Sequence, residues 1–342
     1  MANITDVAKE AGVSIATVSR VVNNNDYPVR AETRAQVLEA VKRLGFRPND
    51  LARSLNQKRT RTVGLLVPDL TNPYYPEIAR GVEDAASAEL YALLFCNTDR
   101  RAEKTEFYVN TLLQKRVDGI IIAGGGTDFT DASTAFAEYG APVVFVGRHG
   151  DGGQSVQISN EAAARDATDH LTLLGHRNIA FLAGPRSLTS VQDRLEGYRA
   201  ALRDAGLQPG DALVREGDFG ERSGYEAPVA LLENAPQPTA IFAANDLMAI
   251  GAMAAVRDAG LGVPADVSVV GFDGIELGSY IRPALTTVAI PTYELGAAAL
   301  RRLLELIARK QEGAPEPDDH TTWLPTELMV RESSALVSGA AR

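Results

Sequence analysis

Apolar residues recur at helical spacing along the first 45 residues of the chain and predict three helices. We expect Thr5 to cap the first helix and Gly12 to follow its last turn in the left-handed conformation. Ser14 is the expected cap of a second helix, which runs from residue 15 to about residue 23. The third helix spans residues 31–44. So short a glycine-containing turn between the first two helices is typical of a helix-turn-helix.

One side of the second helix is expected to face a core and the other to face outward. Val18, Val21 and Val22 are the inward candidates. The outward residues lie at the N-terminal end of the helix and are Ile15, Ala16, Thr17, Ser19 and Arg20. In helix-turn-helix motifs this end of the second helix enters the major groove of DNA.

Beyond residue 61 the pattern changes to short, continuous apolar runs that alternate with helical stretches. Such runs are typical of strands in parallel sheets that helices cover on both faces. The expected strands are residues 62–68, 91–96, 119–122, 143–146, 178–182, 240–243 and 267–272. The expected helices are residues 76–90, 103–114, 161–174, 194–205 and 246–259. Because the alternation occurs twice, it predicts two doubly wound parallel-sheet lobes with a ligand cleft at the carboxyl ends of their strands.

Polar and aromatic residues that follow the expected strands are candidates for that cleft. Two adjacent aromatic residues in a loop suit stacking on a sugar or base, and an arginine that opens a helix can bind hydroxyl or carboxylate groups. One of Asn245 and Asp246 is expected to be only a helix cap. The candidates are Tyr74, Tyr75, Arg194, Phe219, Asn245 and Asp273. Asparagine, aspartate and arginine between aromatic walls indicate a sugar or a nucleoside.

A short segment joins the two regions. Pro48 cannot continue the third helix and Asn49 is a good N-cap, so residues 50–57 can form two helical turns. A helix this short is marginal by itself, and we expect it to be ordered only when it packs against something. The alternative is a charged linker whose basic residues are solvated.

The charge distribution separates the same two regions. The 342-residue chain has a net charge of −10, but residues 1–61 contain 11 Lys and Arg against 6 Asp and Glu, which is +5. The remainder therefore carries −15. A small basic head on a large acidic body indicates a polyanionic partner for the head and a different task for the body.

Other features narrow the class of protein. No apolar run approaches the roughly 18–20 residues that span a bilayer, and no signal-peptide pattern opens the chain, so we expect a cytoplasmic protein without a membrane partner. The single cysteine, Cys96, excludes an internal disulfide. The triple glycine at residues 124–126 lacks the Lys-Ser/Thr ending of a phosphate loop, and no metal-ligand spacing is present. We therefore expect no catalytic residues, no cofactor and no metal.

The head also matches a known family over residues 4–55. The matching segments are Thr5-Asp6-Val7-Ala8-x-x-Ala11-Gly12-Val13-Ser14-x-x-Thr17-Val18-Ser19-Arg20-Val21-Val22-Asn23, Val29-Arg30-x-x-Thr33-Arg34, Leu44-Gly45-Phe46-x-Pro48-Asn49 and Leu51-Ala52-Arg53-Ser54-Leu55. On these residues the chain resembles the LacI/GalR family of bacterial transcriptional repressors. The body resembles the same family nearly to its end, which implies a periplasmic-binding-protein type I fold whose chain crosses between the lobes three times.

The resemblance implies a homodimer that represses transcription from a pseudo-palindromic DNA operator and responds to a small-molecule effector. It also implies that the hinge segments pair across the dimer and enter the minor groove, where Leu55 would wedge between base pairs. The implied DNA-binding residues are Thr5, Ser14, Ile15, Ala16, Thr17, Ser19, Arg20, Asn23, Arg30, Asn49, Ala52, Arg53 and Leu55. The implied effector-binding residues are Tyr74, Tyr75, Arg148, Ser190, Arg194, Phe219, Asn245 and Asp273. The implied domains are residues 1–47 (helix-turn-helix), 48–60 (hinge helix and linker), 61–159 with 291–321 (N-terminal lobe) and 160–290 with 322–342 (C-terminal lobe).

One position departs from the family's pattern. Many members have an acidic residue where this chain has Gly147, so the first lobe lacks one hydroxyl acceptor. Arg148 beside it adds positive charge, which would admit an anionic effector. The alternative function is a solute-binding protein of a transport system, since the body alone would fit one, but the fused basic head argues against it.

Overall fold

The structure is a computed structural model that describes residues 2–22, 28–46, 59–124, 130–148, 153–208, 210–233, 237–315 and 317–337. The chain divides into two compact units, Met1–Thr60 and Arg61–Arg342.

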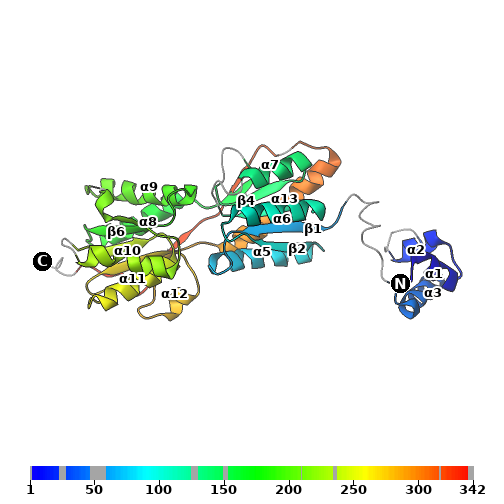
Figure 1. Ribbon diagram of the computed structural model, residues 1–342, viewed down its shortest axis with the longest axis horizontal. Coiled ribbons are helices and arrows are strands. Elements are labelled where there is room, and N and C mark those ends of the chain that lie inside the picture. The colour runs from blue at the N-terminus through cyan, green and yellow to red at the C-terminus, as the bar shows by residue number, and fades with distance from the viewer. Residues whose placement is uncertain are drawn as a thin grey trace. The chain divides into compact units, whose positions relative to one another are not determined.

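The first unit is a head of three helices around a valine core (Figure 1). Its helices are α1 (Ile4–Glu10), α2 (Ile15–Val22) and α3 (Ala31–Leu44). Val7, Val18 and Val37 are fully buried. Gly12 and Gly45 follow α1 and α3 with φ angles of 64° and 58°, which are the left-handed values expected of glycines that end helices.

The cap of α1 differs from the expectation. Asn3, not Thr5, is the N-cap, because its Oδ1 accepts hydrogen bonds from the backbone N–H groups of Thr5 at 2.8 Å and Asp6 at 3.1 Å. The carboxylate of Asp6 accepts in turn from the Asn3 N–H at 2.9 Å, which completes a capping box. The helix begins two residues earlier than expected, so Thr5 lies inside its first turn.

The second unit is built from two sets of strands and helices. The first set is β1 (Thr62–Val67), α5 (Tyr74–Ala88), β2 (Ala92–Asn97), α6 (Ala102–Gln114), β3 (Gly119–Ala123), α7 (Thr130–Tyr139), β4 (Val143–Val146), β5 (Ser155–Gln157), α13 (Thr292–Glu312) and β11 (Thr321–Trp323). The second set is α8 (Asn160–Leu173), β6 (Ile179–Ala183), α9 (Thr189–Asp204), the 3-10 helix η2 (Asp211–Leu213), β7 (Val214–Glu216), α10 (Glu221–Glu233), β8 (Ala240–Ala243), α11 (Asp246–Asp258), β9 (Ser268–Asp273), α12 (Leu277–Tyr280), β10 (Thr286–Ala289) and β12 (Glu327–Met329).

Each set forms one lobe around a six-stranded sheet (Figure 1). The strand orders are β11-β5-β4-β3-β1-β2 and β12-β10-β9-β8-β6-β7. Neighbouring strands are parallel except β10 and β12, which are antiparallel. In the first lobe α5 packs on α13 and α6 on α7, and in the second α8 packs on α9 and α10 on α11. The expected pair of doubly wound lobes is confirmed.

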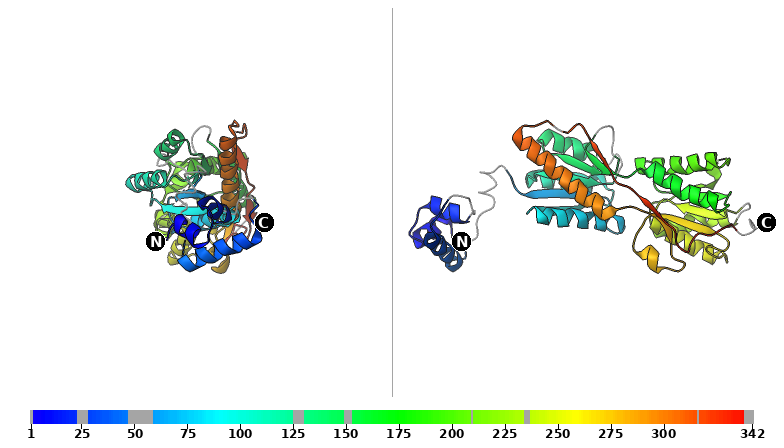
Figure 2. Two further views of the ribbon diagram at one scale, coloured as in Figure 1. Left: turned by 90° about the vertical axis from the view of Figure 1, so that its right-hand side faces the viewer. Right: turned by 180° about the vertical axis from the view of Figure 1, so that it is seen from behind.

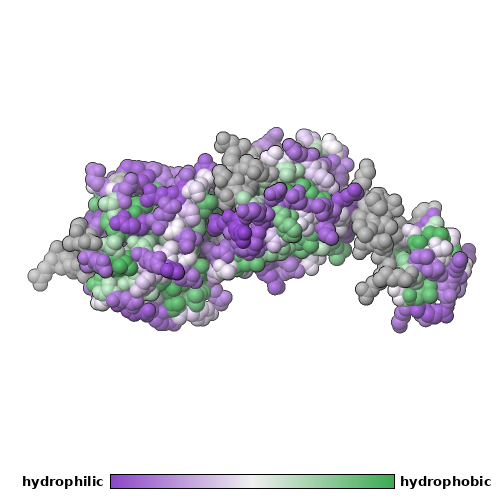
Figure 3. Space-filling model, in the orientation of Figure 1, coloured by the Kyte–Doolittle hydropathy of each residue, from purple (hydrophilic) through white to green (hydrophobic). Residues whose placement is uncertain are grey.

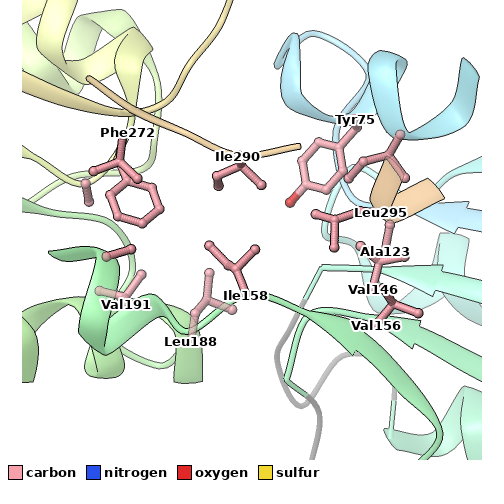
Figure 4. Packing of buried hydrophobic residues seen from close by; sticks show 14 of the residues in the cluster. Tyr75, Ala123, Val146, Val156, Ile158, Leu188, Val191, Phe272, Ile290 and Leu295 are labelled. Atoms are coloured by element: carbon pink, nitrogen blue, oxygen red, sulfur yellow. The ribbon is translucent and has the colours of Figure 1, made fainter. Parts of the chain in front are cut away.

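The strands are buried on both faces. Leu65 of β1 belongs to a cluster with α5 and α13, whereas its neighbour Leu66 packs with α6 and α7. Double coverage of this kind explains the continuous apolar runs in the sequence. Ile158 and Ile290, which lie on segments that cross between the lobes, are 5% and 6% exposed and join the two cores (Figure 4).

The chain crosses between the lobes after β5, after β10 and after β11. Figure 2 shows the third crossing as the red segment that runs from one lobe to the other. Thr322 and Trp323 pair with Val156 and Gln157 of β5. These two residues therefore lie in the first sheet, not in the second lobe to which we assigned residues 322–342, because β11 extends the edge that β5 leaves open.

Hydrophilic residues predominate on the face of the body in Figure 3, and the most hydrophilic group lies on the first lobe beside the second. Among the described residues, no helix is both long enough and apolar enough to cross a bilayer.

Candidate functional site

The N-terminal end of α2 carries most of the DNA-binding candidates of the head. Ser14 is its N-cap as expected, because Ser14 Oγ accepts a hydrogen bond from the Thr17 N–H at 3.1 Å. The hydroxyl groups of Ser14 and Thr17 are also 2.9 Å apart. Ile15 is 47% exposed and Ala16 is exposed beside it, whereas the opposite side of α2 is buried. This end of α2 therefore presents a mixed apolar and hydroxyl surface.

The remaining candidates of the head are distributed as follows. Thr5 and Arg30 are exposed, and Ser19 and Arg20 are partly buried. The other candidates lie outside the described residues and are Asn23, Asn49, Ala52, Arg53 and Leu55. The expected hinge helix at residues 50–57 also lies there.

In the body, one cavity of about 70 Å³ lies between the lobes. A single buried water needs roughly 10–15 Å³ on this scale, so the cavity has room for a small ligand. It is at the carboxyl ends of strands of both sheets, the usual place for ligands in open α/β sheets. All eight effector candidates from the sequence line it: Tyr74, Tyr75, Arg148, Ser190, Arg194, Phe219, Asn245 and Asp273.

Arg194 lies in the second turn of α9 and does not open the helix, because α9 begins five residues earlier than expected, at Thr189. Its side chain is buried, and Nε donates a hydrogen bond to Asn160 Oδ1 at 2.8 Å. The guanidinium carbon lies 3.8 Å from the centre of the Phe272 ring, and Nη1 donates to the carbonyl of Ala244. Burial lowers the pKa of Arg194, and the nearby carboxylate of Asp273 opposes this shift. The guanidinium is thus fixed in orientation and remains charged.

Asp273 is the last residue of β9, and its Oδ1 lies 3.9 Å from Arg194 Nη1. Its side chain is 7% exposed, and this burial raises its pKa well above the usual range for a carboxyl. Its φ of 116° is a strained value for a residue with a side chain. Such strain persists only where neighbours fix the backbone, and it directs this carboxyl to the wall of the cavity.

Asn245, rather than Asp246, is the cap of α11. Asn245 Oδ1 accepts from the Met248 N–H at 3.0 Å, and its Nδ2 donates to the carbonyl of Phe219 at 2.9 Å. Asn245 therefore also holds Phe219, whose φ is 71°. The Phe219 ring lies against Gly184, where an added Cβ would be 2.3 Å from the ring. Asn245 and Gly184 thus fix an aromatic wall of the cavity.

Tyr74 and Tyr75 open α5 and do not lie in a loop as expected. The turn is held by Asn72, whose Oδ1 accepts from the Tyr74 N–H at 3.0 Å and whose carbonyl accepts from the Tyr75 N–H at 3.2 Å. The two rings meet edge to face with centres 5.0 Å apart. Burial raises the pKa of both hydroxyls, so both remain neutral hydrogen-bonding groups.

Arg148 reaches across the cavity to the other lobe. Its Nη1 donates to Asp193 Oδ1 at 3.0 Å. Burial raises the pKa of Asp193, and the charge of Arg148 opposes this effect. The positive charge that the sequence offered to an anionic effector is therefore already balanced by a carboxylate of α9. Ser190 lies one turn earlier on the same helix and is half-buried.

Sequence reasoning missed four polar residues of the cavity, which are Asn72, Arg100, Gln157 and Asn160. Asn72 and Arg100 could have been found, because each follows an expected strand. Gln157 and Asn160 lie on the first crossing between the lobes and carry no comparable signal.

The site offers binding groups rather than metal ligands. Within the part of the chain that the structure describes, no group of three or more His, Cys, Asp or Glu side chains could hold a metal ion. Cys96 is buried away from the cavity, and burial raises the pKa of its thiol to about 11.

A helix-turn-helix head followed by a two-lobed, cleft-forming body defines a regulator that binds DNA with one part and a small molecule with the other. The chain belongs to the LacI family: residues 3–49 match the family "Bacterial regulatory proteins, lacI family", and residues 60–321 match "Periplasmic binding proteins and sugar binding domain of LacI family". The resemblance read from the sequence is confirmed. The match of the head also favours a transcriptional regulator over a transport protein.

Relatives match over almost the whole chain. Catabolite control protein A of Priestia megaterium is 40% identical over 334 residues, which are 97% of this chain and 98% of the relative. The ribose operon repressor of Halalkalibacterium halodurans is 40% identical over 335 residues, which are 98% and 97% of the two chains. These relatives are transcriptional regulators.

Solved structures of related regulators have the same fold as this chain. The Lac repressor dimer bound to operator and the anti-inducer ONPF is 33% identical, with a TM-score of 0.87 over 98% of this chain and 99% of that one. A complex of the transcriptional regulator CelR with cellobiose is 35% identical, with a TM-score of 0.74 over 98% and 100%.

Proposed function

We propose that the protein is a repressor that binds a pseudo-palindromic operator as a homodimer and releases or strengthens that binding when a small polyhydroxylated molecule occupies the cleft. The observation that carries the proposal is a cavity walled by both lobes. A ligand there contacts both lobes at once, so its binding energy depends on their relative orientation. The related Lac repressor structure is a dimer bound to operator, which supports the homodimer.

In the head, Arg20 contacts guanine through its guanidinium fork, and Ile15 and Ala16 contact thymine methyl groups. The exposure of Ile15 and Ala16 at the end of α2 supports this assignment. Residues 48–60 are the hinge, in which Asn49, Ala52, Arg53 and Leu55 contact the minor groove. We assign residues 1–47 to the head. In the body, the first lobe ends after β11, between β11 and β12, and not after residue 321.

In the cleft, Arg194 and Asp273 bind hydroxyl groups of the effector, and Tyr74, Tyr75 and Phe219 provide its apolar walls. The protein has no catalytic activity and no cofactor. It acts in the bacterial cytoplasm, on DNA. The regulatory relatives support the absence of catalysis and the action on DNA in the cytoplasm.

The variant Asp273→Ala tests the effector site. We expect operator affinity without effector to stay within about twofold of the wild type, because Asp273 is in the body, and the response to effector to be lost. Operators are selected from random duplexes, and binding is measured by fluorescence anisotropy with and without the sugars and nucleosides that raise the unfolding midpoint. Asp166→Ala is the matched control, since Asp166 is an exposed carboxylate of α8.

Two outcomes contradict the proposal. A wild-type response in Asp273→Ala would remove Asp273 from the effector site. Failure of the wild-type protein to select any DNA sequence would exclude a repressor.

A further inference from the structure

Arg100 lines the cavity on a strained backbone, as Phe219 and Asp273 do. It follows β2 and lines the cavity from the first lobe. Both Asp99 and Arg100 have left-handed φ angles, 52° and 55°. Left-handed conformations are unfavourable for residues with side chains and persist only where the surroundings impose them.

Side chains around Asp99 impose this conformation. The Asp99 carboxylate accepts a hydrogen bond from Asn97 Nδ2 and pairs with Lys104. Asn97 Oδ1 accepts from the Leu70 N–H at 3.1 Å, which ties the turn to the loop that leads to Tyr74. The turn is therefore fixed from both sides, and Arg100 is held at the cavity.

The Arg100 guanidinium has no carboxylate of the described residues within ion-pair distance, although its charge lowers the pKa of Asp218. The guanidinium carbon of Arg100 lies 5.7 Å from the centre of the Phe219 ring, which belongs to the other lobe. Burial raises the pKa of the Tyr75 hydroxyl, and a hydrogen bond with Arg100 opposes this larger effect. Among the described residues, no ion pair within 4.0 Å includes Arg100. The nearby carboxylate of Asp218 is engaged by Ser223 and by the Gly220 N–H, at 2.9 Å for the latter.

The other charges of the cavity are matched. Arg148 pairs with Asp193 at 3.0 Å, and Arg194 lies 3.9 Å from Asp273. Among the described arginines that line the cavity, Arg100 is the one with no carboxylate within 4.0 Å. A ligand that fills the cavity removes water from this guanidinium, and the loss of hydration is unfavourable unless the ligand brings a negative charge.

We propose that Arg100 determines effector specificity by binding an anionic group, a phosphate monoester or a carboxylate, on a polyhydroxylated effector. The inference rests on the proposed effector site and names the class of ligand that it takes. Arg194 and Asp273 then bind hydroxyl groups at the other end of the molecule. The anionic group is therefore assigned to Arg100, which follows β2, and not to Arg148, which follows β4 and already pairs with Asp193.

The test uses the full chain and matched ligands that differ in charge: glucose, glucose 6-phosphate and glucuronate, and ribose with ribose 5-phosphate. Inorganic phosphate is a further probe. Binding is measured by calorimetry at low ionic strength, where the screening of charges is weak. We expect at least one anionic ligand to bind about tenfold or more tightly than its neutral partner, as charge-assisted hydrogen bonds allow. The two kinds of anionic sugar separate phosphate from carboxylate recognition.

Three variants assign the effect to Arg100. Arg100→Gln should abolish the preference for the anionic ligand, and Arg100→Lys should retain part of it, because it keeps the charge and loses the planar fork. Arg101→Gln is the matched control, since the next residue is exposed and pairs with Glu103 outside the cavity. It should leave all affinities unchanged.

Each alternative outcome is decisive. Equal or better binding of neutral sugars, or an unchanged preference in Arg100→Gln, overturns the inference. The inference is also overturned if none of the anionic probes binds. If neutral sugars bind and alter operator binding, the proposed function stands without this inference; if no ligand alters operator binding, the proposed function itself fails.

Discussion

Two buried carboxyl groups in the second lobe differ in what they contact. Asp273 faces the cavity, whereas Asp246 lies behind it and is fully buried. Asp246 Oδ2 accepts from the Ile275 N–H at 2.7 Å, and Oδ1 accepts from Thr287 Oγ1 at 2.5 Å. These bonds hold the backbone just after Asp273. Asp246 therefore positions the strained residue that is proposed to bind the effector.

The variant Asp246→Asn should change how stability depends on pH. Burial raises the pKa of Asp246 to about 7 from 3.8, so the folded chain binds this proton more tightly than the unfolded chain does. The stability that the neutral Asp246 side chain contributes to the folded chain is fully present below about pH 4 and is lost as the pH rises through about 7. The wild type should therefore lose stability relative to the variant between pH 5 and 7, by up to about 1.4 kcal/mol per pH unit, and not beyond pH 8.

Urea unfolding of both proteins at pH 5, 6, 7 and 8 measures this difference. Asp166→Asn, a change at an exposed carboxyl of α8, is the control and should give no difference in slope. Parallel stability curves for wild type and Asp246→Asn would show that Asp246 does not titrate in this range.

Single residues were predictable where the local signal was strong. Asn245 and Asp273 follow long apolar strands, so they could be found, but the sequence could not decide whether Asn245 or Asp246 caps α11. Arg100 also follows an expected strand and could have been found, but no residue of its turn marks the left-handed conformation. Left-handed turns are normally marked by glycine or asparagine, and here Asp99 and Arg100 adopt them because of contacts with distant residues.

At the scale of elements, the helix pairs of the body meet at glycines. A Cβ on Gly81 of α5 would lie 2.0 Å from the carbonyl oxygen of Tyr293 in α13, and one on Gly296 would lie 2.0 Å from that of Ile78. In the second lobe, a Cβ on Gly197 of α9 would lie 2.1 Å from the carbonyl oxygen of Glu161 in α8. These helices touch backbone to backbone, which fixes how each pair covers its sheet.

The variant Gly296→Ala should destabilise the body by about 3 kcal/mol or more, because the backbone of Ile78 cannot yield as a flexible side chain would. Alanine favours a helix over glycine by about 1 kcal/mol, so any loss of stability in the variant comes from packing and not from helix propensity. Gly210→Ala is the control, since an added Cβ there meets nothing within 4 Å. Urea unfolding compares the two, and equal midpoints would mean that α5 and α13 can move apart without loss.

Elements with complete local patterns were predicted well, and those that depend on distant contacts were not. The apolar runs located β1, β3, β8 and β9 closely. The short strands β5, β7, β11 and β12 have three residues each and are stabilised by partners far along the chain. α10 contains Pro228, which hides its helical pattern. The first turn of α5 was missed because contacts of Asn72, not periodicity, define it.

At the scale of the whole body, three crossings and a few side-chain contacts connect the lobes. The apolar residues of the crossings, Ile158 and Ile290, are buried and tie the cores together at one place. The ion pair of Arg148 and Asp193 joins the lobes at the cavity itself.

The Arg148–Asp193 pair can be tested as a contact that holds the lobes closed. Asp193→Arg places two positive charges together, so we expect the lobes to part, and adding Arg148→Asp should restore closure. The side chains are 52% and 22% exposed, which limits the pair to about 1 kcal/mol, or roughly a fivefold change in population. Arg186→Gln is the control, because its ion pair with Glu216 lies within one lobe.

Energy transfer between dyes at Glu106→Cys in α6 and Glu233→Cys in α10 reports the distance between the lobes. Cys96 is buried with its pKa raised to about 11, so the dyes should react only at the introduced cysteines. We expect lower transfer in Asp193→Arg, recovery in the double variant, and a smaller difference at high salt, where the charges are screened. If the single variant transfers like the wild type at low salt, the pair does not hold the lobes; if the double variant fails to recover, the effect comes from shape and not from charge.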